Sequence, residues 1–218
     1  MKLYGHLFSS YTQKALTALY ENDTRFEFLD LSPDNPDIYA EFARRWPIRR
    51  FPLLVDGERQ VMEATCIIEY LHVHHPGGSR LIPDDADAAI EVRMLDRFFD
   101  NYVHAQVQRI VGDSLRPDPA DRDAYGVNEA RERLDIAYAW LDGHMASREW
   151  AAADAFTLAD CAAAPALFYA DWTHRIGGQF RNVHAYRQRL LARPSFARCV
   201  EGGRPYRHFF PLGAPDRD

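Results

Sequence analysis

The hydrophobic pattern of this chain changes once, in a stretch rich in Pro, Gly, Ser and Asp between positions 76 and 87. Before this stretch, short alternating segments typical of strands are interleaved with segments of helical spacing. After it, the apolar residues recur at the intervals of amphipathic helices. Because a composition break between two such patterns marks a linker, we predict a first domain at 1–76, a linker at 77–87 and a second domain at 88–218.

The first domain has the element order of an α/β fold. Alternating residues predict strands at 1–5 and 25–31, and a hairpin at 51–62 that turns at Asp56-Gly57. Helical spacing predicts helices in the segments 12–21, 36–45 and 64–75. The order strand, helix, strand, helix, hairpin, helix is the thioredoxin-like pattern, a βαβ half followed by a ββα half.

The second domain is predicted to be all-helical. Two long helices are expected at 88–115 and 122–144, packed antiparallel. Thr157 and Asp160 form a capping-box pattern at the start of a third helix, whose apolar continuation predicts a buried central position. Two further helices are expected at 179–192 and 195–201, divided by Arg193-Pro194.

Composition and charge exclude several classes of protein. A chain of 218 residues that is 47% hydrophobic can bury a sizeable core, which excludes disordered and fibrous proteins. The net charge of -6, with both signs interleaved, disfavours nucleic acid as a partner. No apolar run approaches the roughly 18 residues of a membrane span, and the N-terminus is not a signal peptide. We therefore expect a cytoplasmic protein, in which Cys66, Cys161 and Cys199 are buried, reduced thiols.

Three segments together resemble the glutathione transferase family. The first is the run FPLLVDG at 51–57 followed by MEAT at 62–65 and IIEYL at 67–71. The second is the opening KLYGH at 2–6 with the serines Ser9 and Ser10 after it, and the third is FTLAD at 156–160. Their order and spacing identify the chain as similar to serine-type members, with an opening like that of phi and zeta members.

The resemblance implies a thioredoxin-like domain that binds glutathione, followed by an all-helical domain that completes the site for a second substrate. It implies a cytoplasmic, homodimeric transferase of the detoxification type, with glutathione as co-substrate and a small hydrophobic electrophile as second substrate. No metal is implied. The spacing of His72, His74 and His75 brings only two of these side chains together on a helix, which is fewer than a metal site needs.

The resemblance also implies positions for the groups that bind glutathione. Pro52 stands where the family has a cis proline, which leaves the backbone of Phe51 free to pair with the cysteinyl part of the tripeptide. Glu63 stands where an acid and a neighbouring serine hold the γ-glutamyl group; here Ala64 replaces that serine, and Thr65 is expected to compensate. The alternative for Glu63 is a charge that only stabilises the helix N-terminus.

The thiolate stabiliser is expected at the start of the first helix, where the helix dipole and a hydroxyl donor both lower the pKa of a thiol. Ser9 is the first candidate, because the sequence HLFS at 6–9 resembles the His-Pro-x-Ser opening of the family, with Leu7 in place of the proline. Ser10 is the second candidate. The third reading is that both serines only cap the helix.

The remaining expectations concern the glycyl end of glutathione, the C-terminal tail and the pocket for the second substrate. Arg49 and Arg50 are placed to clamp the glycyl carboxylate, or else lie on a solvated loop. The aromatic and basic tail at 204–211 either covers the site or packs on the surface. The pocket for the second substrate is expected to use the following residues: Tyr11, Phe98, Tyr102, His104 and Gln106.

Two functions fit these residues. The first is a transferase that directs a glutathione thiolate at an electrophilic carbon. The second is a transferase-like binding or interaction protein whose glutathione site is weakened by Leu7 and Ala64.

Overall fold

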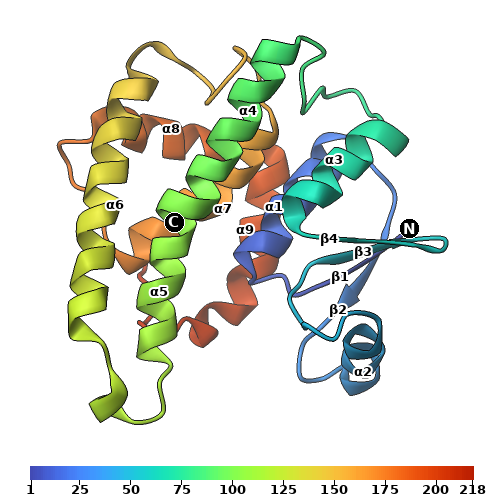
Figure 1. Ribbon diagram of the computed structural model, residues 1–218, viewed down its shortest axis with the longest axis horizontal. Helices are drawn as coiled ribbons and strands as arrows, with labels where there is room; N and C mark the ends of the chain where they lie inside the picture. Colours follow the sequence, from blue (N-terminus) through green and yellow to red (C-terminus); the bar gives the residue numbers. More distant parts are fainter.

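The computed structural model describes residues 1–218 and has two domains lying side by side. In Figure 1 the mixed domain lies on the right and the helical domain on the left, with α1 at the boundary between them. The elements of the first domain follow the predicted order: β1 (Lys2–Gly5), α1 (Ser10–Glu21), β2 (Glu27–Asp30), α2 (Pro36–Arg45), β3 (Leu53–Asp56), β4 (Arg59–Met62) and α3 (Ala64–His74).

The four strands form one sheet in the order β2-β1-β3-β4. Strand β1 is parallel to β2 and antiparallel to β3, and β3 and β4 form the hairpin whose Gly57 adopts a φ of 59° in the turn. The predicted thioredoxin-like domain is therefore confirmed.

Alternation along the strands separates two apolar layers. Leu3 and Leu54, paired across β1 and β3, belong to the large core that includes α1 and α3. Their neighbours Tyr4 and Leu53 point the other way and pack with Phe42 of α2 in a small second cluster. The sheet is thus covered on both faces, with α2 alone on the outer one.

The second domain contains only helices, as predicted. Its first long helix is continuous but carries a wide π-helical turn in the middle. The predicted start at 88 is two residues late, because the side chain of Asp85 caps the helix by accepting from the N–H of Ala88 at 2.8 Å. The helices of the second domain are α4 (Ala86–Phe98), η1 (Phe99–His104), α5 (Ala105–Ser114), η2 (Pro119–Asp121), α6 (Ala124–His144), η3 (Met145–Ser147), α7 (Leu158–Thr173), α8 (Arg181–Ala192), α9 (Pro194–Gly203) and η4 (Arg204–Phe209).

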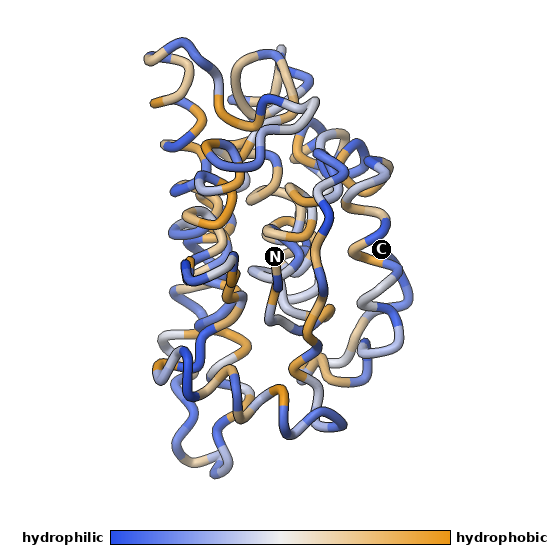
Figure 2. Tube along the Cα trace, turned by 90° about the vertical axis from the view of Figure 1, so that its right-hand side faces the viewer, coloured by the Kyte–Doolittle hydropathy of each residue, from blue (hydrophilic) through white to orange (hydrophobic).

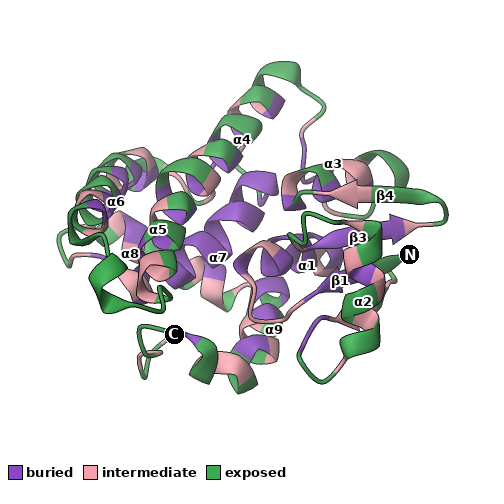
Figure 3. Cartoon of the chain, turned by 60° about the horizontal axis from the view of Figure 1, so that its bottom comes forward, coloured by how far each residue is buried: buried purple, intermediate pink, exposed green.

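Helix α7 occupies the centre of the molecule. Nearly all of its residues are buried, and it packs against α1 as well as against α4 and α8 (Figure 3). The predicted capping box is present: the buried Asp160 carboxylate accepts from the backbone N–H and the hydroxyl of Thr157 at 2.8 and 3.1 Å. This helix links the core of the second domain to the helix that opens the first.

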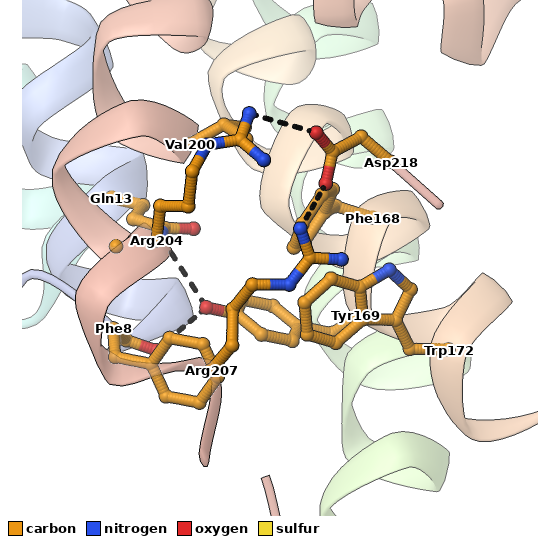
Figure 4. Close-up of a pocket in the computed structure, with 10 residues that line it drawn as sticks. Phe8, Gln13, Phe168, Tyr169, Trp172, Val200, Arg204, Arg207 and Asp218 are labelled. Carbon is orange, nitrogen blue, oxygen red and sulfur yellow. Dashed lines mark hydrogen bonds and ion pairs between the residues drawn. The ribbon is translucent and has the colours of Figure 1, made fainter. Parts of the chain in front are cut away.

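The C-terminal segment folds back over α7 and α9. Figure 4 shows Arg204 and Arg207 converging on the Asp218 carboxylate, with N···O distances of 2.9 and 3.1 Å. Beneath them, the hydroxyl of Tyr169 donates to the carbonyl of Phe8 at 2.7 Å, which ties α7 to the loop before α1. The segment that follows α9 is therefore held next to the N-terminus of α1.

One prediction about the cysteines is wrong. Cys161 and Cys199 are buried, but Cys66 is exposed, because it lies on the side of α3 opposite Ile67, Ile68 and Leu71.

Hydrophilic residues interrupt the apolar ones along the whole chain (Figure 2), and none of the helices has the length and apolar character needed to cross a membrane.

Candidate active site between the two domains

A cleft of about 900 Å³ lies between the two domains. Its floor is the N-terminus of α1, and its walls come from the loop before β3, the turn between β4 and α3, helix α5 and the C-terminal segment. The residues from the first domain that line it are Phe8, Ser9, Ser10, Tyr11, Arg49, Arg50, Phe51, Pro52, Glu63 and Ala64. Most of the side chains proposed from the sequence for glutathione are therefore brought together.

Ser9 is the N-cap of α1. Its hydroxyl oxygen accepts from the N–H of Thr12 at 3.3 Å, and it donates to no group in the structure. The hydroxyl proton of Ser9 is therefore available to a ligand at the positive end of the helix dipole.

Ser10 occupies the next position and is buried. Its hydroxyl oxygen lies 2.7 Å from Nε2 of His104 in the second domain. Burial, together with the charge of Lys14, lowers the pKa of His104 to about 3, so this imidazole is neutral at physiological pH. The two serines thus differ: the Ser9 hydroxyl donates to no group, whereas the Ser10 hydroxyl is already hydrogen-bonded to His104.

Tyr11 also lies at this boundary. Its ring packs edge to face on His104, with centroids 4.8 Å apart. Burial and the carboxylates of Asp100 and Glu63 raise the pKa of Tyr11 to about 12, so its hydroxyl stays protonated. Tyr11 therefore lines the cleft and also packs against the second domain.

The peptide bond between Phe51 and Pro52 is cis, as predicted. The N–H and C=O of Phe51 have no backbone partner, since pairing of β3 with β1 begins only at Leu53. The neighbouring Arg49 and Arg50 line the cleft, are exposed and form no ion pair. An extended ligand strand and an anionic group could both be accommodated here.

Helix α3 begins at this cleft. Glu63, just before it, has a φ of 66°, and its exposed carboxylate forms no ion pair. The first bond of the helix runs from the N–H of Ile67 to the carbonyl of Glu63 at 2.9 Å, so the N–H groups of residues 64–66 have no acceptor within the helix. Such a helix terminus binds a carboxylate, and the Glu63 side chain can pair with a cation.

Thr65 does not replace the missing serine at position 64. Its hydroxyl accepts from Nζ of Lys14 at 2.9 Å and donates to the carboxylate of Asp96, and it does not line the cleft. Helical geometry turns successive residues by about 100°, so Thr65 faces the second domain when Ala64 faces the cleft. The hydroxyl of Thr65 therefore belongs to a buried ionic network between the domains.

That network is centred on Lys14, whose side chain is 1% exposed. Its ammonium lies 2.6 Å from Asp96 and 2.8 Å from Asp100, and Arg97 also contacts both carboxylates. None of these four residues was predicted from the sequence, because an isolated lysine in a predicted helix has no pattern that marks it as buried.

Only part of the predicted second-substrate pocket is formed. His104 and Tyr11 line the cleft, but Phe98, Tyr102 and Gln106 line a separate apolar groove of about 560 Å³ between α4 and α6. These three residues are spaced by four and share one side of the helix, whereas His104, Gln108 and Val111 share the side that faces the first domain. The placement predicted for Phe98, Tyr102 and Gln106 is therefore wrong.

The wall opposite α1 contains residues that were not predicted for this role: Val107, Gln108, Val111, Leu115 and Tyr169. Once the side of the helix that carries His104 is known, helical spacing places residues 107, 108 and 111 on the same side. The tail does reach the site, with Phe209, Phe210 and Pro211 in the lining. Of the two readings of the tail, the structure favours the one in which it covers the cleft.

Comparisons with known proteins agree with this geometry. Residues 1–72 match the glutathione S-transferase N-terminal domain, and residues 98–194 match the glutathione S-transferase C-terminal domain. The chain belongs to the glutathione S-transferase family. Both domains of the family are present, in the family's order, and together the two matches cover most of the chain.

The relatives are similar along nearly their whole length. A glutathione S-transferase of Hyoscyamus muticus is 26% identical over 210 residues, which cover 92% of this chain and 98% of the relative. A glutathione S-transferase structure from Methylobacterium radiotolerans, in complex with glutathione sulfonate, is 26% identical with a TM-score of 0.75, covering 91% of this chain and 93% of that chain. One from Methylobacillus flagellatus, with glutathione bound, shares the fold with a TM-score of 0.81 at 22% identity, covering 91% and 98% of the two chains.

No group of three His, Cys, Asp or Glu side chains is arranged to hold a metal ion. His75 instead lies 2.6 Å from the carboxylate of Asp56, and His74 lies 3.0 Å from Arg59.

Proposed function

We propose that this chain is a glutathione transferase: it binds glutathione in the interdomain cleft, stabilises the thiolate and directs it at a hydrophobic electrophile. The observation that supports this most is the free hydroxyl of Ser9 at the N-terminus of α1, in the same cleft as the unpaired backbone of Phe51. A thiolate needs a donor and a positive potential, and this position supplies both.

The other parts of glutathione have matching groups around the cleft. The backbone of Phe51, beside cis-Pro52, would pair with the cysteinyl unit as an added strand. Glu63 would pair with the ammonium of the γ-glutamyl unit, and the free N–H groups at the start of α3 would hold its carboxylate. Arg49 and Arg50 would bind the glycyl carboxylate.

The second substrate would lie toward the helical domain. Tyr11 and His104, together with the apolar side chains of α5 and Phe210, leave an apolar region beyond the serines. A neutral imidazole and a neutral phenol favour an uncharged, hydrophobic compound there. The reaction that we propose is conjugation of glutathione to this compound. The cytoplasmic location expected from the sequence stays a prediction.

The change Ser9→Ala tests this proposal. In an ultraviolet titration of glutathione bound to saturated protein, wild type is expected to lower the pKa of the thiol, and Ser9→Ala to lose about one to two units of that shift. This is the size expected for one hydrogen bond to a charged group. Transfer to a chlorinated aromatic electrophile should fall by about 10- to 100-fold.

Ser147→Ala is the matched control, because Ser147 is exposed, lies outside the cleft and makes no side-chain hydrogen bond. The transferase proposal is rejected if wild type binds glutathione without lowering the thiol pKa, or if Ser9→Ala behaves like Ser147→Ala.

The second candidate function is a glutathione S-transferase-like binding protein without catalysis. Ala64 favours it, because no hydroxyl stands at this position and that of Thr65 is held by Lys14 and Asp96. Failure to bind glutathione at millimolar concentration in the same titration would select this candidate.

We also propose that the chain forms a homodimer through an apolar face of the second domain. The predicted helix at 88–115 carries two apolar sides: Leu95 and Phe99 are buried in the core, whereas Ile90 and Met94 are exposed. Met94 lines the groove between α4 and α6, together with Tyr102, Ile136 and Trp140, which are also exposed. Exposed apolar surface of this kind is typical of an interface.

Ile136→Arg is expected to halve the mass measured by light scattering, since a buried unpaired charge opposes association. Tyr125→Arg, at an 80% exposed position of the same helix outside the groove, should leave the mass unchanged. An unchanged mass for Ile136→Arg would exclude this face as the interface.

A further inference from the structure

The contact between Ser10 and His104 joins the two domains inside the cleft and has no role in the function proposed above. Ser10 lies in the first turn of α1, and His104 ends the π-helical turn Phe99–His104. Both side chains are buried, and Oγ of Ser10 is 2.7 Å from Nε2 of His104. A π-helical turn inside an α-helix often marks a functional position.

The neighbours of the ring identify which nitrogen carries the proton. The amide nitrogen of Gln108 lies 3.0 Å from the same Nε2 atom, and an amide nitrogen only donates. With the amide nitrogen turned toward the ring, Nε2 is the unprotonated nitrogen, and its single lone pair is shared by the Gln108 amide at 3.0 Å and the nearer Ser10 hydroxyl at 2.7 Å. The proton of the neutral ring then lies on Nδ1. That atom is buried and has no partner.

This assignment determines the direction of the bond to Ser10. A ring nitrogen without a proton can only accept, so the Ser10 hydroxyl must donate to it. Ser10 then presents only oxygen lone pairs to the cleft, and lone pairs repel a thiolate.

We propose that His104 is a positioning residue that holds the hydroxyl proton of Ser10, so that Ser9 is the only serine able to donate to the glutathione thiolate. The inference rests on the proposed function and assigns the roles of the two adjacent serines. It also explains how a residue of the helical domain acts on the thiolate site of the first domain, through one hydrogen bond across the boundary.

The proton position can be measured without any ligand. In ¹⁵N NMR of histidine-labelled wild type, with the His104 signals identified by their loss in His104→Leu, we expect a neutral ring protonated at Nδ1 with Nε2 as acceptor. A ring protonated at Nε2 overturns the proposal, because His104 would then donate to Ser10 and leave its hydroxyl proton free for the thiolate.

A rescue experiment tests the consequence for glutathione. The thiol pKa is measured on saturated Ser9→Ala, on Ser9→Ala/His104→Leu, and on the triple variant that adds Ser10→Ala. Removing His104 frees the proton of Ser10, so the double variant is expected to regain about one pKa unit of the shift that Ser9→Ala loses, and the triple variant to lose it again.

The outcomes separate this proposal from the function itself. If the double variant binds glutathione but regains no shift, or if the triple variant keeps the regained shift, Ser10 is not the restrained donor and the proposal is wrong. If wild type shows no shift at all, the proposed function fails, and the NMR result alone decides whether His104 holds the proton of Ser10. Thermal unfolding of each variant confirms that the compared proteins are folded.

Discussion

Replacing Asp160 by asparagine is expected to destabilise the folded protein by about 3–5 kcal/mol, because hydrogen bonds to a buried carboxylate contribute about 1.5–3 kcal/mol each and at least two are lost. The fully buried carboxylate accepts from the N–H of Ala151 at 2.9 Å and from the hydroxyl of Tyr186 at 2.6 Å, besides its two bonds from Thr157. An asparagine offers one acceptor oxygen and turns an NH₂ group toward donors.

The loss extends beyond one helix cap. Burial raises the pKa of Asp160, and the surrounding donors oppose that effect by favouring the charged form. Through Tyr186 and Ala151, the carboxylate also joins α8 and the loop before α7 to the central helix. Because α7 packs on α1, the domain boundary and the cleft depend on the same residue.

Urea unfolding followed by circular dichroism measures this change. Asp154→Asn is the control: Asp154 is exposed, makes no hydrogen bond, and has a φ of 49°, which asparagine tolerates. The control is expected to stay within about 0.5 kcal/mol of wild type. Equal stabilities of the two variants would show that the Asp160 carboxylate does not hold α7 in place.

Lys14→Met is the second change with a large expected effect, a loss of about 3–5 kcal/mol in the free energy of unfolding. The lysine ammonium is buried between Asp96 and Asp100, at 2.6 and 2.8 Å, with Asp96 also 1% exposed. Removing the cation leaves carboxylates in the interior with only the half-exposed Arg97 to compensate them.

Lys2→Met is the matched control, because Lys2 forms a 3.9 Å pair with Glu27 in which both side chains are about half exposed or more, at 47% and 60%. Such pairs contribute about 0–1 kcal/mol. The double variant Lys14→Met/Asp96→Leu should recover part of the lost stability, because it also removes the Asp96 carboxylate that Lys14→Met leaves unpaired. If the double variant is no more stable than Lys14→Met, the unpaired carboxylate is not the cause of the loss.

Most of the fold could be predicted from local sequence, because its signals are local. The alternation in the segments at 1–5 and 25–31, the Asp56-Gly57 turn and the Thr157–Asp160 capping box each depend on residues that are close neighbours in the chain. Their order along the chain was sufficient for the thioredoxin-like domain and the helical domain. Helix ends were less certain, as at Asp85, because a single capping side chain moves the start of a helix by a turn or less.

The first half of the cleft was indicated by the resemblance to the family. The resemblance singled out Ser9, Phe51, Pro52 and Glu63, and the structure places these residues around one cleft. The direction of Thr65 was not predictable, because the competing partner Lys14 comes from another helix.

What the sequence determined by itself was therefore the set of elements, their order and the loops that carry polar groups, since periodicity, caps and turns are properties of neighbouring residues. Tertiary structure alone decided which side of the helix at 86–114 faces the first domain. It brought His104 to Ser10 across 94 positions of sequence and turned Phe98 and Tyr102 to the other side. The physical reason is that an amphipathic pattern identifies an apolar face but not its partner, and a buried hydrogen bond exists only once two packed surfaces bring its donor and acceptor together.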